Sequence, residues 1–294
     1  MQSLADRAAC APLSRSQCGV SLASCGRAGW TDAVNDWTVT PLAASLGARV
    51  DGVRLTEAGD VELGALQDLL DKHHVLVVSG QDEFSVADHI RVGESFGDPY
   101  VHPFIDAIPE HPAILQVIKE PDEAETFGGE FWHCDISFTS PPAAVSILHA
   151  CELPPIGGDT LFANTALAFD RLSPRLQPWV SELTATHVYP EKEEGPSTAA
   201  THPVARVHPR SGRRALYVNP AFVIRVEELE REESDALLSF LYAHQTRPEF
   251  QVRVRWETGQ VVLWDNRTTV HYAMNDYPGH RRRLQRVTAL ERPG

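Results

Sequence analysis

Apolar residues recur at helical spacing in the first half of the chain. Over residues 61–74 four leucines lie three or four positions apart and predict an amphipathic helix, namely Leu63, Leu66, Leu69 and Leu70. A short apolar run follows at once over 75–80 and predicts a buried strand that stops at Gly80. Residues 85–96 predict a second helix, for which Ser85 is the expected cap.

From residue 131 onward the pattern is mainly that of strands. Short apolar runs bounded by Gly, Pro or Asn predict strands within 143–153, 157–164, 214–220, 250–257, 260–266 and 282–290. In 250–257 apolar and polar side chains alternate, as in a half-buried antiparallel strand. One helix is expected over 234–245, with Ser234 as its cap. The order of elements predicts a mainly β fold with flanking helices, built as a double-sheet barrel.

Two segments depart from this pattern. Residues 1–36 are rich in Ser, Ala and Arg, so we expect a disordered tail there, ahead of one domain over 37–294. A transit peptide is the alternative interpretation of this segment. Residues 187–205 are polar and contain three prolines, which predicts a long mobile loop that could act as a lid.

Charge and cysteine content limit the class of protein. The net charge of -14 argues against a nucleic-acid partner, because binding to phosphates needs surplus Lys and Arg. No apolar run approaches the roughly 18 residues of a membrane span, so no membrane partner is expected. The five cysteines show no paired metal-binding spacing, which favours free thiols in a reducing compartment and a cytoplasmic location.

The segment "FWHCDISF" holds the first candidate metal ligands. His133 and Asp135 lie two positions apart, and in a strand such residues point to the same face while Cys134 points away. An imidazole and a carboxylate would then converge on one point. A single His-x-Asp is weak evidence, and a solvated surface pair is the alternative.

A later segment adds a third candidate ligand and two cations. His271 follows a "WDN" turn, and Arg282 and Arg286 share one face of the predicted strand 282–290. Two arginines on an inward face indicate bound anions, unless the side chains reach water at the rim of the barrel. Two His and one carboxylate leave three positions open on iron, as Fe(II) oxygenases require, although Zn or Co would also fit these ligands.

Longer motifs make the comparison specific. The chain contains, in this order, "WHCD", "PPAAVSILHACELPPIGGDTLFAN", "HPRSGRRALYVN", "LLSFLYAHQTRPEFQVRVRW" and "LWDNRTTVHYAMNDYPGHRRRLQR". Together they resemble the TauD/TfdA family of 2-oxoglutarate-dependent dioxygenases over about residues 37–290. The resemblance implies a double-stranded β-helix, or jelly roll, with helices packed outside. It also implies Fe(II) held by His133, Asp135 and His271, with 2-oxoglutarate and O2 as co-substrates.

The resemblance assigns further roles. Thr160 and Arg282 match positions that bind the distal carboxylate of 2-oxoglutarate, although Thr160 could also simply begin a strand. Arg286 stands where family members face the anionic group of the substrate or the oxo-acid carboxylate. His102 stands at the place of a substrate-facing imidazole, and a packed structural histidine is the alternative.

The implied reaction is hydroxylation of a small anionic substrate, with release of succinate and CO2. A taurine-like or alkyl sulfonate substrate is expected, and a sulfate ester or an aryloxyalkanoate is the alternative. Ile105 and Gly129 replace the polar groups with which taurine-cleaving members hold the amine, so strict taurine specificity is not expected. Phe222, together with Phe104 and Phe138, could line such a pocket or pack in the core.

Rival functions remain open on the residues alone. A halogenase usually lacks the ligand carboxylate, so Asp135 argues against it. A non-catalytic metal-binding barrel would have no need for Thr160, Arg282 and Arg286 together, and a zinc hydrolase needs a separate general base. The resemblance also favours a homo-oligomer, because family members are often dimers or tetramers.

Overall fold

The structure is a computed structural model, and it describes residues 36–103, 105, 107–126, 130–189 and 198–292. The described helices are α1 (Asp60–His73), α2 (Val86–Phe96), α3 (Thr165–Asp170), α4 (Leu176–Ser181), α5 (Arg231–Gln245) and the 3-10 helix η1 (Pro248–Phe250). Among these helices there is none with the length and apolar content that crossing a membrane would require. The predicted tail lies outside the described residues, apart from Asp36.

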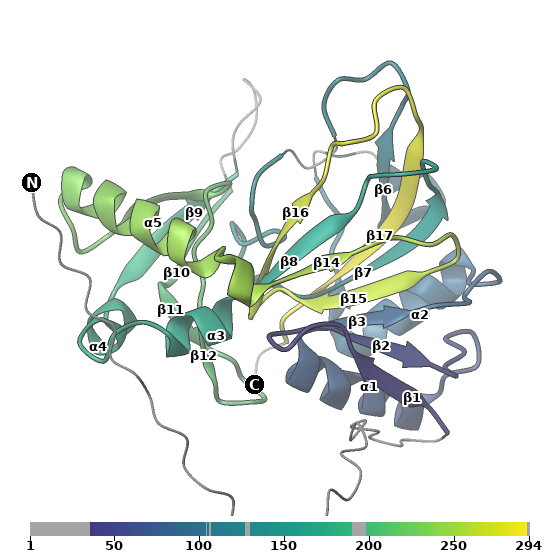
Figure 1. The fold of residues 1–294 in the computed structure, drawn as a ribbon, viewed down its shortest axis with the longest axis horizontal. Helices are drawn as coiled ribbons and strands as arrows, with labels where there is room; N and C mark the ends of the chain where they lie inside the picture. Colours follow the sequence, from purple (N-terminus) through teal and green to yellow (C-terminus); the bar gives the residue numbers. More distant parts are fainter. Residues whose placement is uncertain (1–35, 104, 106, 127–129, 190–197, 293–294) are drawn as a thin grey trace, which may run out of the picture. The chain divides into compact units, whose positions relative to one another are not determined.

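The larger sheet contains nine of the described strands. Its order is β1-β2-β3-β15-β7-β17-β6-β5, and β4 pairs with β17. The bounds are β1 Thr38–Pro41, β2 Ala48–Asp51, β3 Val75–Val78, β4 Asp98–Pro99, β5 Ala107–Ile108, β6 His111–Lys119, β7 Ala143–Glu152, β15 Val261–Asp265 and β17 Arg282–Leu290. Antiparallel pairs dominate, with β2 and β3 as a parallel pair (Figure 1).

A smaller sheet faces the larger one. Its strands run in the order β14 (Gln251–Val254), β8 (Thr160–Asn164) and β16 (Thr269–Ala273), all antiparallel. Side chains of both sheets form one apolar core cluster, including Val75, Val77, Leu148, Phe162, Val252, Val254, Val262 and Trp264. The predicted mainly β class with flanking helices is confirmed, and the two facing sheets form the predicted jelly roll.

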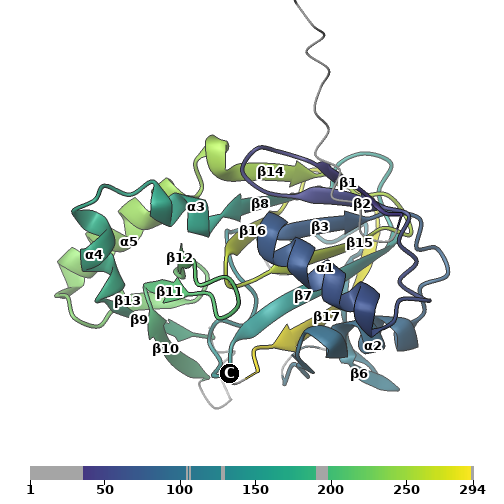
Figure 2. The same cartoon turned by 90° about the horizontal axis from the view of Figure 1, so that it is seen from below.

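Helices α1 and α2 cover the opposite face of the larger sheet (Figure 2). The four predicted leucines of α1 are all buried, and Ser85 caps α2 by accepting the backbone N–H of Asp88, so both helix predictions are confirmed. Gly93 lets α2 approach β17 closely, because a Cβ there would lie 2.4 Å from Cγ1 of Val287. The outer face of the larger sheet is therefore covered by α1 and α2, while its inner face remains available for a site.

A third region consists of shorter elements around α5. Two small sheets, β10-β9-β13 and β11-β12, pack with α3, α4 and α5 around a separate apolar cluster. Their strands are β9 (Thr184–Val188), β10 (Ala199–Pro203), β11 (Ala205–Val207), β12 (Arg214–Leu216) and β13 (Val223–Val226).

The predicted mobile loop over 187–205 is wrong for most of its length. Its two ends form the hairpin of β9 and β10, and residues 190–197 lie outside the described residues. The polar composition was misleading because His187 and His202 point inward. Nδ1 of His187 lies 2.9 Å from the hydroxyl of Ser137, and Nε2 of His202 donates to the Ser137 carbonyl at 2.9 Å.

Two further differences concern helix α5 and strand β6. Helix α5 begins at Arg231, earlier than predicted, because Glu230 and Glu233 form a capping box. Ser234 is therefore not the cap; its hydroxyl is buried and accepts the backbone N–H of Val226. Strand β6 was not predicted at all, although it supplies part of the inner face next to β17.

Candidate metal centre

A short β-bridge brings the two histidines together. The backbone N–H of His133 donates to the carbonyl of His271 at 2.9 Å, and the N–H of His271 donates back at 2.7 Å. Asp135 lies in the turn that follows, where Ile136 takes the unusual φ of +39°. The prediction of a strand over these residues is wrong, since the bridge and the turn produce the convergence. Cys134 does point away, and its sulfur accepts from Asn219 at 3.3 Å.

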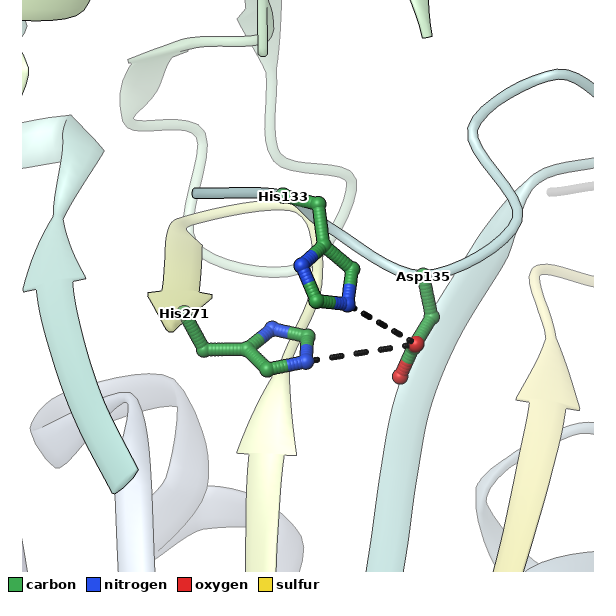
Figure 3. A group of neighbouring side chains, drawn as sticks. All are labelled: His133, Asp135 and His271. Atoms are coloured by element: carbon green, nitrogen blue, oxygen red, sulfur yellow. Dashed lines mark ion pairs between the residues drawn. The ribbon is translucent and has the colours of Figure 1, made fainter. Parts of the chain in front are cut away.

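The three side chains point toward one another (Figure 3). Nε2 of His133 and Nε2 of His271 each lie 4.0 Å from Oδ1 of Asp135, and the three ligand atoms lie within 4.8 Å of one another. These separations are too long for hydrogen bonds. They match a shared ion, because ligand atoms about 2.1 Å from a metal are separated from each other by roughly 3–4 Å.

The protonation states also suit a metal. Burial lowers the pKa of His133 and takes the pKa of His271 well below its usual value, so both rings are neutral at pH 7. Nδ1–H of His133 donates to the carbonyl of Phe131 at 3.0 Å, which leaves the lone pair on Nε2. Burial acts to raise the pKa of Asp135, but Arg286 and the other polar neighbours hold it below its usual value. The group therefore offers two neutral imidazoles and one carboxylate, a donor set that fits Fe(II).

A buried network fixes the carboxylate of Asp135. The hydroxyl of Ser146 donates to Oδ2 at 2.6 Å, and Nδ2 of Asn266 donates to that hydroxyl at 2.9 Å. Oδ1 of Asn266 accepts both the backbone N–H of Asp135 at 3.0 Å and the indole N–H of Trp264 at 3.1 Å. Sequence reasoning missed Ser146, because nothing in an apolar strand indicates which hydroxyl faces a metal ligand.

A second subsite, beside the candidate metal ligands, contains the buried cationic side chain of Arg282. Arg282 is only 3% exposed, its Nε–H donates to the Gly158 carbonyl at 3.1 Å, and among the described residues no carboxylate forms an ion pair with it. Burial lowers its pKa to about 10, so it stays charged at pH 7. The hydroxyl of Thr160 accepts from Trp256 at 3.0 Å and can still donate to a ligand.

These residues and the two candidate ligand histidines line one small cavity. His133, His271, Thr160, Arg282 and Arg286 all contribute to its wall, and its volume is about 40 Å³. The alternative in which both arginines reach water at a rim is wrong, since the Arg282 residue is 3% exposed and the Arg286 side chain 12%. An unpaired buried guanidinium next to a metal centre fits the distal carboxylate of a chelating oxo acid.

Arg286 connects the metal centre to a further small pocket. One of its terminal N–H groups donates to Oδ1 of Asp135 at 2.5 Å, while its Nε is buried without a hydrogen-bond partner among the described residues. His102 lines the pocket with it. Burial, and then the charge of Arg286, lowers the pKa of His102 to about 4, so its ring is neutral at pH 7.

Aromatic side chains form a wall beside His102. Its ring centroid lies 5.5 Å from that of Tyr189 and 6.4 Å from that of Phe138, and Phe138 lies 5.0 Å from Phe222. Phe222 also contacts His133 edge to face at 6.4 Å. Phe138 and Phe222 thus belong both to a core cluster and to the surroundings of the metal centre.

Not every residue named from sequence can be placed. Phe104 and Gly129 lie outside the described residues, and Ile105 packs against the core cluster formed by both sheets. Sequence reasoning missed Tyr189. Its only signal in the sequence is that it directly follows the alternating apolar and polar residues of β9.

Another polar group, Asp71, His208 and Asp265, also has metal-like spacing. Its oxygens are already used, however. Arg267 donates to both oxygens of Asp265, at 2.8 and 2.6 Å, and Nε2 of His208 donates to one of them at 2.9 Å. Burial acts to raise the pKa of Asp265, but Arg267 and His208 hold it far below its usual value. This group is an ion-pair network that supports the turn before His271.

Comparisons with known proteins agree with this geometry. The family described as "Taurine catabolism dioxygenase TauD, TfdA family" matches residues 38–288. An alpha-ketoglutarate-dependent sulfate ester dioxygenase of Pseudomonas putida is 35% identical over 272 residues, which is 85% of this chain and 88% of that protein. An alpha-ketoglutarate-dependent 2,4-dichlorophenoxyacetate dioxygenase of Cupriavidus pinatubonensis is 32% identical over 281 residues, or 85% and 96% of the two chains.

A solved structure shows the same fold. The chain superposes on a taurine dioxygenase from Burkholderia xenovorans with a TM-score of 0.75 and 34% identity, covering 87% of this chain and 90% of the other.

Proposed function

Because the chain belongs to the TauD/TfdA family of Fe(II)- and 2-oxoglutarate-dependent dioxygenases, we propose that it hydroxylates a small anionic substrate of the alkyl sulfonate or sulfate ester class. The convergence of His133, Asp135 and His271 within 4.8 Å carries this proposal. The domain that does so spans residues 37–294 in our proposal, and it acts in the cytoplasm.

Different residues bind the metal, the co-substrate and the substrate in this proposal. We assign iron ligation to Nε2 of His133, Nε2 of His271 and the carboxylate of Asp135. When bound, iron with 2-oxoglutarate supplies oxidative decarboxylation of the oxo acid, coupled to hydroxylation of a C–H bond. Thr160 and Arg282 bind the distal carboxylate of 2-oxoglutarate, in a site dry enough for the charge interaction to be strong.

Arg286 and His102 bind the anionic head of the substrate. A guanidinium with an unused Nε and a neutral imidazole supply donors without adding a second full positive charge. The aromatic side chains of Phe138, Tyr189 and Phe222 provide an apolar wall for the rest of the molecule. Such a wall favours an alkyl chain or an aryl group over the amine of taurine.

The relatives support this substrate class. They include the sulfate ester dioxygenase of Pseudomonas putida and an alpha-ketoglutarate-dependent sulfonate dioxygenase of Saccharomyces cerevisiae, which is 33% identical over 283 residues. Hydroxylation at the carbon that bears a sulfate or sulfonate gives an unstable product, which collapses to an aldehyde or ketone and releases the anion. An aryloxyalkanoate would undergo the same chemistry and remains the second candidate, since the dichlorophenoxyacetate dioxygenase is also a relative.

Succinate release tests the proposal. Iron-loaded protein is given 2-oxoglutarate, O2 and one of four compounds: hexyl sulfate, hexanesulfonate, taurine or 2,4-dichlorophenoxyacetate. We expect hexyl sulfate or hexanesulfonate to raise the rate of succinate formation above the substrate-free rate, and taurine to do so far less. Asp135→Ala is the matched control and should abolish the response. If none of the four compounds stimulates succinate release, the proposed substrate class is wrong.

A further inference from the structure

A buried lysine lies directly across the sheet from Arg282. In the antiparallel pair of β6 and β17, Lys119 is opposite Arg282, and two positions along Val117 is opposite Leu284. Opposite residues of an antiparallel pair project to the same face, with Cβ atoms about 5 Å apart. Val117 and Arg282 both line the cavity at the candidate metal centre, so Lys119 lies on the same face of the sheet, beyond the residues that line the cavity.

Neither cation has an acidic partner in the described part of the chain. Lys119 and Arg282 are each only 3% exposed, and no carboxylate there forms an ion pair with either. Tyr277 and then Asp159 are the acidic groups that act on Arg282, and the carboxylate of Asp159 is paired with Arg253 at 2.5 Å.

Aromatic rings give the two cations only partial compensation. Nζ of Lys119 lies 4.7 Å from the ring centroid of Tyr277, and the guanidinium of Arg282 lies 5.8 Å from that of Trp256. A cation–π contact stabilises by about 0.5–2 kcal/mol, whereas removing a charge from water costs several kcal/mol. An anion between Lys119 and Arg282 would offset this cost for both cations.

We propose that Lys119 is a second cationic ligand of the distal carboxylate of 2-oxoglutarate, acting together with Arg282. This inference rests on the proposed function. The Nε–H of Arg282 is already used by the Gly158 carbonyl, so its terminal N–H groups remain for the ligand. The ammonium group of Lys119 then supplies the additional charge that makes the site selective for an oxo acid with a second carboxylate.

The test compares two ligands that differ only at the distal end. 2-Oxopentanoate has the chelating head and carbon chain of 2-oxoglutarate but ends in a methyl group. Binding of each ligand to Mn(II)-loaded protein is measured without O2 by calorimetry, and by the shift that the ligand causes in the melting temperature. The variants are Lys119→Met, which keeps the length and removes the charge, and Lys119→Arg, which keeps the charge.

The expected result is specific to the dicarboxylate. Lys119→Met should bind 2-oxoglutarate about 10- to 100-fold more weakly, as the loss of one charged hydrogen bond predicts, while binding of 2-oxopentanoate stays the same. Lys119→Arg should recover most of the affinity. Arg283→Met is the matched control, because it removes one positive charge from the outward face next to Arg282 and should leave both affinities unchanged.

The outcomes separate this inference from the proposed function. If the wild-type protein does not bind 2-oxoglutarate, the proposed function itself fails. If the wild-type protein binds it and Lys119→Met binds it equally well, Lys119 is not a ligand. Equal weakening of both oxo acids would also overturn the inference, because it would show that Lys119 only supports the fold.

Discussion

The Ser146→Ala variant tests how Asp135, the proposed metal ligand, is held in place. Ser146 is fully buried, and its hydroxyl donates to Oδ2 of Asp135 at 2.6 Å. The substitution removes that donor and leaves the side chain of Asn266 without its acceptor. It changes no metal ligand and removes a single oxygen atom, so an effect on metal binding reports on the orientation and ionisation of Asp135.

The size of the effect follows from the geometry. A short, buried hydrogen bond to a carboxylate contributes about 1.5–3 kcal/mol, and a partner of a metal ligand typically changes metal affinity by about 10- to 100-fold. Ser146 is also one of the groups that hold the pKa of Asp135 below its usual value. Without it the carboxylate binds a proton more readily, and that proton competes with the metal. We therefore expect metal affinity to fall about 10- to 100-fold at pH 7.

The assay is titration of the metal-free protein with Co(II), followed by the visible absorption of the bound ion. Ser95→Ala is the matched control, because the Ser95 hydroxyl donates to a backbone carbonyl within α2, in a helix that packs on the outer face of the sheet. If folded Ser146→Ala protein binds Co(II) as tightly as wild type does, the argument that Ser146 holds the ligand is refuted.

Three further predictions concern stability. Burial lowers the pKa of His89 to about 3, so the contribution of the neutral ring to stability is complete above pH 6.5 and is lost as the pH falls toward 3. In urea unfolding, the wild-type protein should therefore lose about 2 kcal/mol of unfolding free energy at pH 5, and His89→Leu should not show this loss. Equal pH dependence of stability in the two proteins would contradict the burial argument. Asp265→Asn leaves Arg267 buried without its carboxylate partner and should lower the free energy of unfolding in urea by about 3–5 kcal/mol. A decrease below about 1 kcal/mol would contradict the importance of this buried ion pair. Gly93→Ala drives a methyl group into Val287 and should lower stability by about 1–3 kcal/mol, which thermal unfolding measures; an unchanged melting temperature would contradict the close packing.

The three candidate ligands could be named from the sequence because their residue types and spacing carry the signal. The reason given for His133 and Asp135 was nevertheless incorrect, since no strand joins them. A bridge to the strand of His271 and a turn at Ile136 bring the groups together, and periodicity along one segment does not reveal a pairing with a segment more than a hundred residues away.

Elements with regular periodicity were predicted best. The buried leucines of α1 and the alternating strand β14 follow directly from side-chain spacing. The segment 187–205 failed because its buried polar residues, His187 and His202, look like loop residues in a sequence. Their burial depends on tertiary hydrogen bonds to Ser137, which composition does not show.

The least predictable residues are those whose role depends on a partner strand. Strand β6 is apolar on both faces and gives no clear alternation, so neither the strand nor the inward direction of Lys119 could be predicted. Ser146 and Asn266 likewise have ordinary positions in the sequence, and only the sheet places them against Asp135.

The most direct test of the central claim is the visible spectrum of anaerobic protein with Fe(II) and 2-oxoglutarate. If His133, Asp135 and His271 hold Fe(II) and leave two positions for the oxo acid, a weak metal-to-ligand charge-transfer band should appear when 2-oxoglutarate is added. Asp135→Ala should not show the band. A folded, iron-loaded wild-type protein that shows no band on addition of 2-oxoglutarate would contradict the account.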